Sequence, residues 1–180
     1  MAYAVQPLKS KRDIEKVKKA LHGRNLLLFI LGINTSLRIS DLLSLRVGDV
    51  YGDYIELKER KTKKTKRIKI NKSVSLAIKS LVPAEASPND WLFPSRKGDA
   101  PISRVQAWRI LNAAADRAGL CDIRFGTHSL RKTFAYHAYK SGVELPLLMR
   151  VLNHSSEKET LRYIGIESEQ IDDVYVDVCL

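Results

Sequence analysis

The most apolar stretch of the chain has the length of a helix but is much too short to cross a membrane. Residues 24–34 contain an apolar run from Leu26 to Ile33, interrupted only by Gly32. A membrane span needs about 20 such residues. A helix that is apolar on most of its faces is normally surrounded by other elements. We therefore expect residues 24–34 to form the central helix of a folded core, which a chain of 180 residues can bury.

Helical spacing of apolar residues recurs through most of the remaining sequence. Four of the expected helices are preceded by a residue that can cap a helix, namely Ser10, Ser40, Ser103 and Thr127, and Ser10 with Asp13 resembles a capping box. The ranges that we expect to be helical are 11–22, 24–34, 41–46, 72–81, 104–118, 128–140, 144–152 and 156–163.

Strand patterns are confined to a short central part of the chain. Residues 54–57 and 68–70 alternate like two strands of a hairpin, and residues 91–93 have the composition of a short third strand. The sequence thus predicts an α+β fold, mainly α-helical, with a small antiparallel β-sheet.

The charge distribution indicates a polyanionic partner. The net charge is +11 and the sequence pI is about 9.7. Residues 164–180 hold five acidic and no basic residues, so the preceding 163 residues carry a net charge of +16. A basic body of this kind suggests nucleic acid, although a lysine-rich surface without a partner has the same composition.

The cysteines and the N-terminus indicate a reducing compartment. Cys121 and Cys179 form no metal-binding or disulfide pattern, and no signal peptide opens the chain. We expect free thiols and a cytoplasmic location.

Basic residues are most concentrated between the two predicted strands. Residues 58–69 contain eight basic side chains and one acidic side chain. Lysines also protect an exposed sheet edge from aggregation, but that need explains fewer of them. We therefore favour phosphate contact. The candidate DNA-binding residues are Lys58, Arg60, Lys63, Lys64, Lys66 and Arg67.

Three other groups of residues have functional chemistry, although each is weak evidence alone. His128 and Arg131 share a face at a helix start, where anions are favoured. Arg38 lies in a turn, with Asp41 three residues later. His154 lies at a break between two helices, and Tyr163 follows nine residues later. The ordinary reading of each is a surface or core residue, or a structural ion pair.

Taken in order, these groups resemble the catalytic domain of the tyrosine recombinases, also called the phage integrase family. The matching elements are Thr35-Ser36-Leu37-Arg38 with Asp41, the hairpin residue Lys61, His128-Ser129-Leu130-Arg131, Asn153-His154, and Tyr163. The resemblance covers roughly residues 10–175, nearly the whole chain. Five elements in the right order are hard to obtain by chance.

The resemblance implies DNA strand cleavage and rejoining through a 3′-phosphotyrosyl intermediate. Arg38 and Arg131 would bind the non-bridging phosphate oxygens, with His128 and His154 as further donors. Tyr163 would be the nucleophile and His128 its base. Lys61 would protonate the leaving 5′-oxygen. No nucleotide cofactor or metal is implied, because the adduct conserves the bond energy.

Several departures from the family pattern affect these assignments. Asn153 and Ser36 stand where glycine is usual, and the hairpin lacks its usual glycine, so Lys63 or Lys64 are alternatives to Lys61. Asp41 would brace an arginine or a histidine.

The expected organisation is one catalytic domain over residues 1–180. It has no room for the family's N-terminal domain, and it resembles either an excised domain or a naturally short member such as the fimbrial phase-inversion recombinases. Residues 164–180 would form a tail that docks on another protomer. Packing of this tail on its own core is about as probable.

The expected partners are double-stranded DNA and other copies of the chain, in a tetrameric synapse. We expect no membrane and no small-molecule substrate. Three alternatives fit part of the pattern: a non-catalytic DNA-binding protein on the same fold, strand relaxation of the type IB topoisomerase kind, and a basic RNA-binding protein. The first needs none of Arg38, His128 and Tyr163. The second would act as a monomer, and the third has only the net charge in its favour.

Overall fold

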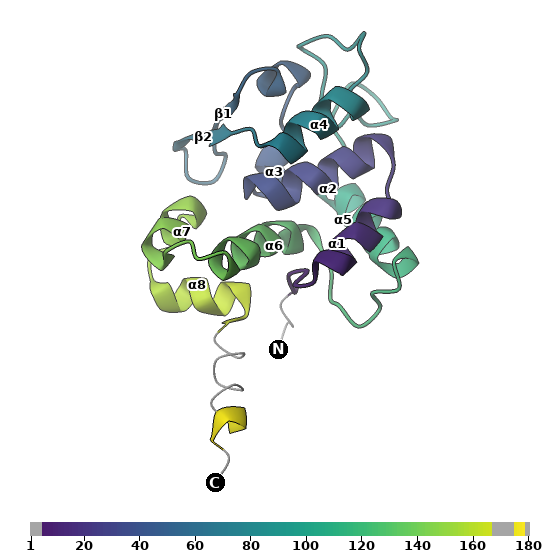
Figure 1. The fold of residues 1–180 in the computed structure, drawn as a ribbon. Coiled ribbons are helices and arrows are strands. Elements are labelled where there is room, and N and C mark those ends of the chain that lie inside the picture. The colour runs from purple at the N-terminus through teal and green to yellow at the C-terminus, as the bar shows by residue number, and fades with distance from the viewer. Residues whose placement is uncertain (1–4, 167–174, 179–180) are drawn as a thin grey trace.

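The helix α2 (Gly23–Thr35) lies in the middle of the molecule, as its sequence predicts (Figure 1). The computed structural model describes residues 5–166 and 175–178. Within these residues the chain is mainly helical with one two-stranded antiparallel sheet, so the predicted fold class is confirmed. None of the helices in this described part is long and apolar enough to cross a membrane.

Most of the observed helices agree with the ranges predicted from the sequence, but the helix predicted at 41–46 lies at Ile39–Leu42, and the 3-10 helix η1 was not predicted. In chain order they are α1 Lys11–Lys19, α2 Gly23–Thr35, α3 Ile39–Leu42, the 3-10 helix η1 Val47–Val50, α4 Lys72–Leu81, α5 Arg104–Arg117, α6 Thr127–Lys140, α7 Leu145–Leu152 and α8 Glu157–Ile164.

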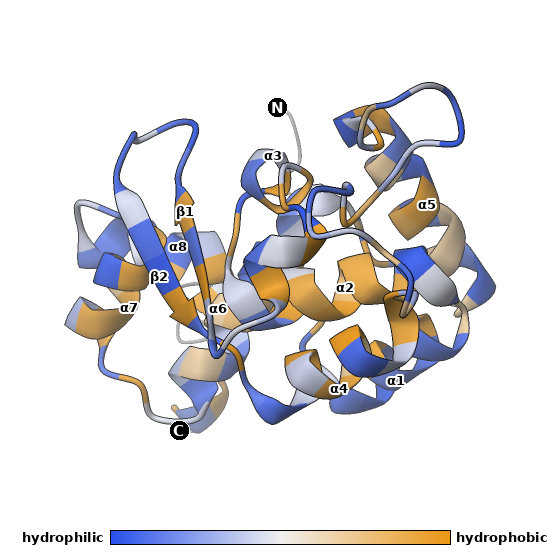
Figure 2. Ribbon diagram, turned by 90° about the horizontal axis from the view of Figure 1, so that it is seen from above, coloured by the Kyte–Doolittle hydropathy of each residue, from blue (hydrophilic) through white to orange (hydrophobic). Residues whose placement is uncertain are grey.

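The central helix contributes to two separate apolar clusters. Leu27, Leu28 and Leu31 pack with α3, α4 and the segments around the hairpin. Phe29 packs on the opposite side, with α1, α5 and α6. Figure 2 shows α2 as an apolar band in the interior of the molecule. A third cluster, formed within α6, α7 and α8, lies beyond α2 and includes Leu148 and Ile164.

The hairpin is anchored by one buried side chain and carries four of the eight basic residues of 58–69 on its loop. Strands β1 (Tyr54–Lys58) and β2 (Thr65–Lys69) pair with Lys58 opposite Thr65. Ile55 is fully buried and fixes one face of the hairpin on the core. The loop 59–64 is closed by two backbone hydrogen bonds between Glu59 and the end of the loop, from the Glu59 N–H to Lys64 O at 2.9 Å and from the Lys63 N–H to Glu59 O at 2.9 Å. In Figure 2 this loop projects from the body of the molecule.

The predicted third strand is wrong. Trp91 forms only an isolated bridge to Arg46, and the Leu92 N–H donates to Leu45 O at 2.9 Å. The segment therefore pairs with the chain before η1 and not with the hairpin. Pro94 follows directly and has no N–H with which to continue a ladder.

Two predicted helix caps are also wrong, while two others are confirmed. Helix α6 begins one residue early, and the Gly126 N–H donates to the Ser129 hydroxyl at 3.1 Å, so Thr127 is not the cap. Helix α3 begins at Ile39, before Ser40. Ser10 and Ser103 do cap α1 and α5.

The predicted docking tail falls mostly outside the described residues. Residues 167–174 and 179–180 are not described, and the structure shows only residues 175–178 of that segment after Ile166. Tyr175, Val176 and Val178 are exposed.

The close approach of α2 and α6 yields a stability prediction. A Cβ atom added at Gly32 would lie 2.4 Å from Leu130 Cδ1, and Leu130 is buried. Helix propensity alone favours alanine over glycine by about 1 kcal/mol. Because overpacking a core costs about 1–3 kcal/mol, we expect Gly32→Ala to lower the free energy of unfolding in a urea titration. The same substitution should cost less in a Leu130→Ala background, where only the Cβ contact at 3.0 Å remains. Stabilisation by Gly32→Ala alone would contradict this packing.

Candidate active site

A left-handed turn after α2 presents the first candidate arginine. Ser36 has φ of 57° and is fully buried, in a conformation that glycine would adopt more easily. The turn reverses the chain, and Arg38 becomes the residue before α3. Leu37 is buried between them and holds the turn on the core. The Arg38 side chain therefore lies at the edge of the body, partly exposed to solvent.

The second candidate arginine, Arg131, is almost completely buried. Only 4% of its surface is exposed. Its Nη1 donates to Ser36 O in the turn after α2, and its Nη2 donates to Leu152 O at 2.6 Å. Leu152 is the last residue of α7, where a carbonyl lacks an intrahelical partner. One guanidinium thus joins α6 to both the Ser36 turn and the end of α7.

His128 lies in the first turn of α6, one turn before Lys132 and on the same face as Arg131. Partial burial and then the charge of Arg131 lower the pKa of its imidazole below the ordinary value. The ring is therefore mostly neutral near pH 7 and able to accept a proton.

His154 has a defined orientation and packs against Tyr163. Its Nδ1 lies 3.1 Å from the Thr160 hydroxyl, and that hydroxyl donates to Ser156 O at 3.1 Å. Because the single hydroxyl proton is already used, Nδ1 of His154 is the donor and Nε2 carries the free lone pair. The two rings meet edge to face, with centroids 4.9 Å apart. Burial lowers the pKa of His154.

Tyr163 is partly buried in α8, among cationic groups. Burial raises the pKa of its hydroxyl above the ordinary value, against the opposing charges of Arg131 and Arg38. Lys132 Nζ lies 5.0 Å from the centroid of the tyrosine ring. The ring is thus held between His154 and a lysine, a favourable arrangement for a π-face.

The hairpin lysines divide into exposed and buried ones. Lys58, Lys61, Lys63 and Lys64 are exposed. Lys66 instead points inward, and its Nζ donates to Val151 O of α7 at 3.0 Å. Burial, and then the charge of Arg131, lowers the pKa of Lys66 to about 8.

Two further candidates of the hairpin group, Arg60 and Arg67, are both exposed but differ in their distance from the site. Arg67 lies outside it, paired with Glu56 at 2.8 Å and stacked on the Tyr54 ring. Arg60 lies beside Lys61, at the site itself.

Two buried carboxylates lie beneath these cations. Asp41 is fully buried, and its Oδ1 accepts from the Arg60 backbone N–H at 2.9 Å. Its Oδ2 has no hydrogen-bond partner among the described residues. Asp41 therefore braces the hairpin, whereas the sequence suggested that it would brace an arginine or a histidine.

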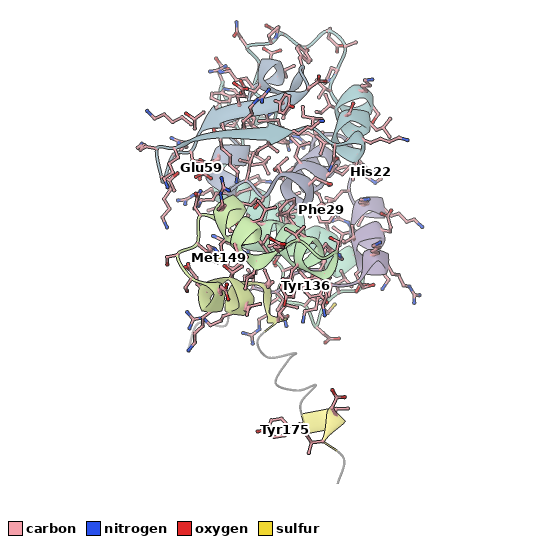
Figure 3. All side chains as sticks on the ribbon, turned by 60° about the vertical axis from the view of Figure 1, so that its left-hand side comes forward. His22, Phe29, Glu59, Tyr136, Met149 and Tyr175 are labelled. Carbon is pink, nitrogen blue, oxygen red and sulfur yellow. The ribbon has the colours of Figure 1, made fainter. Side chains whose placement is uncertain are left out.

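Glu59 is the second buried carboxylate, and its side chain is 1% exposed. Figure 3 shows it at the end of the hairpin, toward the side of the helix that carries Met149. It accepts from Arg38 Nη1 at 2.9 Å, the Thr62 hydroxyl at 2.6 Å and Asn153 Nδ2 at 2.9 Å. Burial would raise the pKa of Glu59, but the Thr62 hydrogen bond and the Arg38 charge lower it below the ordinary value.

One cavity of about 570 Å³ brings the sequence candidates together. The predicted catalytic residues that line it are Arg38, Lys61, His128, Arg131, His154 and Tyr163. They come from the turn after α2, the hairpin loop, α6, the turn after α7, and α8. Arg104, at the start of α5, also lines it. The cavity thus gathers cationic donors around a phenol, which is the composition of a site for a phosphate group.

Sequence reasoning missed Glu59, the inward direction of Lys66, and Lys132. Glu59 had one available signal, because it is the single acid within the basic hairpin segment. Lys132 follows His128 by four residues and so shares its helix face, but that spacing is common. Nothing in the sequence distinguished Lys66 from the other basic residues of the hairpin.

Comparison with known proteins gives a consistent family match. The model of the phage integrase family matches residues 10–170. The "Probable integrase/recombinase YoeC" of Bacillus subtilis is 45% identical over 171 residues, covering 93% of both chains.

Solved structures show the same fold. The XerA recombinase superposes with a TM-score of 0.77 and 19% identity, over 97% of this chain and 66% of that one. A lambda integrase tetramer bound to a Holliday junction gives a TM-score of 0.66 and 16% identity, over 91% of this chain and 49% of that one. The chain therefore spans about half to two thirds of these two proteins.

The partly buried Lys66 should be visible in a titration. An exposed lysine titrates at about 10.4, so the Lys66 ammonium is lost at a lower pH than that of an exposed lysine. NMR of lysine Cε should show one resonance with a midpoint of about 8, absent from a Lys66→Gln variant.

The sign of the linked stability change follows from the same shift. The unfolded chain binds this proton more tightly than the folded chain does. The charge on Lys66 therefore lowers the free energy of unfolding by its full amount below about pH 8. The effect fades as pH rises toward about 10.4. A titration in which every lysine shows the pKa of an exposed lysine would contradict the inward position of Lys66.

Proposed function

The chain belongs to the phage integrase family of tyrosine recombinases, and on that premise we propose that it cleaves and rejoins DNA strands through a bond between Tyr163 and a backbone phosphate. The observation that carries this proposal is the shared cavity. Six side chains from five separate segments, each expected from the sequence, line it together. A fold kept only for binding DNA would not need a phenol among these cations.

The proposed first step exchanges one phosphate ester bond for another. The Tyr163 oxygen attacks the phosphorus, its proton passes to His128, and the bond from phosphorus to the 5′-oxygen breaks. Lys61 gives a proton to that oxygen. The products are a 3′-phosphotyrosyl bond and a free 5′-hydroxyl, and attack by the 5′-hydroxyl of another strand reverses the step. No external energy source is needed, because the ester bond is conserved.

The site residues stabilise the charge that develops during this exchange. Arg131 and Arg38 supply donors to the non-bridging oxygens. The backbone carbonyls that hold Arg131 fix its orientation before DNA arrives. The lowered pKa of His128 suits a base at neutral pH, since the ring is neutral there.

We further propose that residues 1–180 act as one catalytic domain on double-stranded DNA. The basic hairpin loop and Arg104 lie beside the cavity, where phosphates next to the cleaved one would pass. Exchange between two duplexes requires several protomers, and the lambda integrase neighbour is a tetramer on a Holliday junction. A tetrameric synapse is our proposal for this chain as well, with residues 164–180 docking between protomers.

The nucleophile can be tested by trapping the cleaved strand. DNA fragments that carry 5′-bridging phosphorothiolates should give an adduct with the wild-type chain that survives denaturing electrophoresis, because the released thiol does not reverse the step. Tyr163→Phe should give none, and Tyr51→Phe, at an exposed position outside the cavity, should behave as wild type. Binding of DNA without any wild-type adduct would favour the non-catalytic alternative.

The role of Lys61 can be separated from that of its neighbours by the same chemistry. A thiolate leaves without protonation, since thiols have pKa values of about 8.5. We expect Lys61→Ala to slow cleavage of an ordinary phosphodiester by about 100-fold or more. The phosphorothiolate bond should be cleaved at nearly the wild-type rate. Lys63→Ala and Lys64→Ala should show no such selective rescue, and rescue of either one would move the proton donor to that residue.

A further inference from the structure

The carboxylate of Glu59 lies where three parts of the site meet. Its partners are Arg38 in the turn after α2, Thr62 in the hairpin loop, and Asn153 at the end of α7. These residues are widely separated in the sequence. Lys66 Nζ lies 4.0 Å from the same carboxylate. We call this group of five residues the Glu59 cluster.

The geometry of the Glu59 cluster favours an ionised carboxylate. Oε1 accepts from Arg38, while Oε2 accepts from both Thr62 and Asn153. A glutamine has one acceptor oxygen and one NH₂ donor at these positions. With its NH₂ toward Arg38, two donors would meet. With its NH₂ toward Asn153 and Thr62, the Asn153 amide would have to turn over and the Thr62 hydroxyl would have to accept. Either way the charge-assisted contact with Arg38 is lost, so the contacts cannot all be kept as they are.

Within the hairpin, Glu59 also fixes the loop that carries Lys61. The loop is closed by backbone hydrogen bonds at Glu59 itself, and Thr62 binds its side chain. Lys63 adopts a left-handed conformation with φ of 59°. The position of the Glu59 backbone and side chain thus sets the position of the whole loop, including Lys61.

At the other end of the cluster, Asn153 connects Glu59 to His154. Asn153 has φ of 52° and ends α7. The residue is exposed, so its amide could point into water, yet it donates to the buried carboxylate. His154 is the next residue. A glycine here would suit the backbone but would have no side chain to make this contact.

We propose that Glu59 is a positioning residue whose carboxylate couples Arg38, the Lys61 loop and the turn that carries His154. Glu59 does not contact the phosphate in this proposal, which rests on the proposed function of the site. Its negative charge offsets part of the surrounding positive charge, so it opposes DNA binding while it organises cleavage. A residue that merely stabilises the fold would affect both steps together.

The coupling can be tested in the free protein with a reciprocal pair of variants. Asn153→Asp breaks the contact by pairing two carboxylates, while Glu59→Gln removes the charge of the acceptor and keeps a contact only if the Asn153 amide turns over. The double variant restores it, because the amide introduced at position 59 donates to the carboxylate introduced at position 153. Donor and acceptor are then reversed, while the total charge is unchanged. Aspartate, like asparagine, tolerates the left-handed conformation.

Hydrogen exchange measures this without DNA. We expect faster exchange at residues 60–64 and 154–155 in each single variant, and recovery in the double variant. Because Asn153 is exposed, Asn153→Asp should fold even where Glu59→Gln does not. If Asn153→Asp left exchange in the hairpin loop unchanged, the coupling would be overturned, whatever the catalytic result.

Cleavage supplies the functional readout. At saturating DNA with an ordinary phosphodiester, whose cleavage needs Lys61, Glu59→Gln should slow cleavage by about 100-fold, the effect of a displacement of about 1 Å in a reacting group, without weaker DNA binding. The double variant should recover at least tenfold of that loss. Glu56→Gln is the matched control, because Glu56 lies on the same strand and is exposed. A Glu59→Gln variant that cleaves like wild type would overturn the positioning role, whereas absence of any wild-type adduct would overturn the proposed function instead.

Discussion

The buried guanidinium of Arg131 is the interaction on which the arrangement of the site depends. Arginine is rarely buried without a partner, because a desolvated charge is unfavourable unless it is hydrogen-bonded. Here the partners are backbone carbonyls of Ser36 and Leu152, at the end of the Ser36 turn and of α7. Neither carbonyl is engaged within a continuing helix, so both are available. Arg131, the side chain that would bind a phosphate, therefore also sets the distance between the Ser36 turn and the end of α7.

The second constraint is the balance of charge inside the cavity. Arg38, Arg131 and Lys66 repel one another, and this repulsion adds to burial in lowering the pKa of Lys66. Asp41 and Glu59 are buried beneath them and offset part of that repulsion. The two carboxylates offset only part of the repulsion among the cations, and a bound anion such as a phosphate would offset the rest. The free protein therefore holds the cations close together at some expense in stability, and binding of DNA would relieve it.

The sequence predicted the helices and the candidate site residues better than it predicted the hydrogen bonds that hold those residues in place. Apolar spacing placed α4 at residues 72–81, and the order of motifs identified six of the residues that line the cavity. Apolar spacing is a local signal, and the motifs of the family follow one another in a fixed order. The hydrogen bonds that hold the site residues join distant segments. Glu59 and Asn153 are 94 positions apart in the sequence, and Lys66 and Val151 are 85 apart. The third strand was mispredicted for a similar reason, since residues 91–93 had the right composition but met Leu45 and not the hairpin.

Tyr163 belongs to the smallest of the three apolar clusters. Within the described residues, that cluster is formed by α6, α7 and α8, while α2 contributes to the other two. Few buried apolar contacts mean a low free energy of local opening. Helix α8 is therefore expected to separate from the body far more often than the whole chain unfolds. The proposed nucleophile, Tyr163, would then have its own equilibrium between docked and released states, set by a few apolar side chains and largely independent of the stability of the central helix.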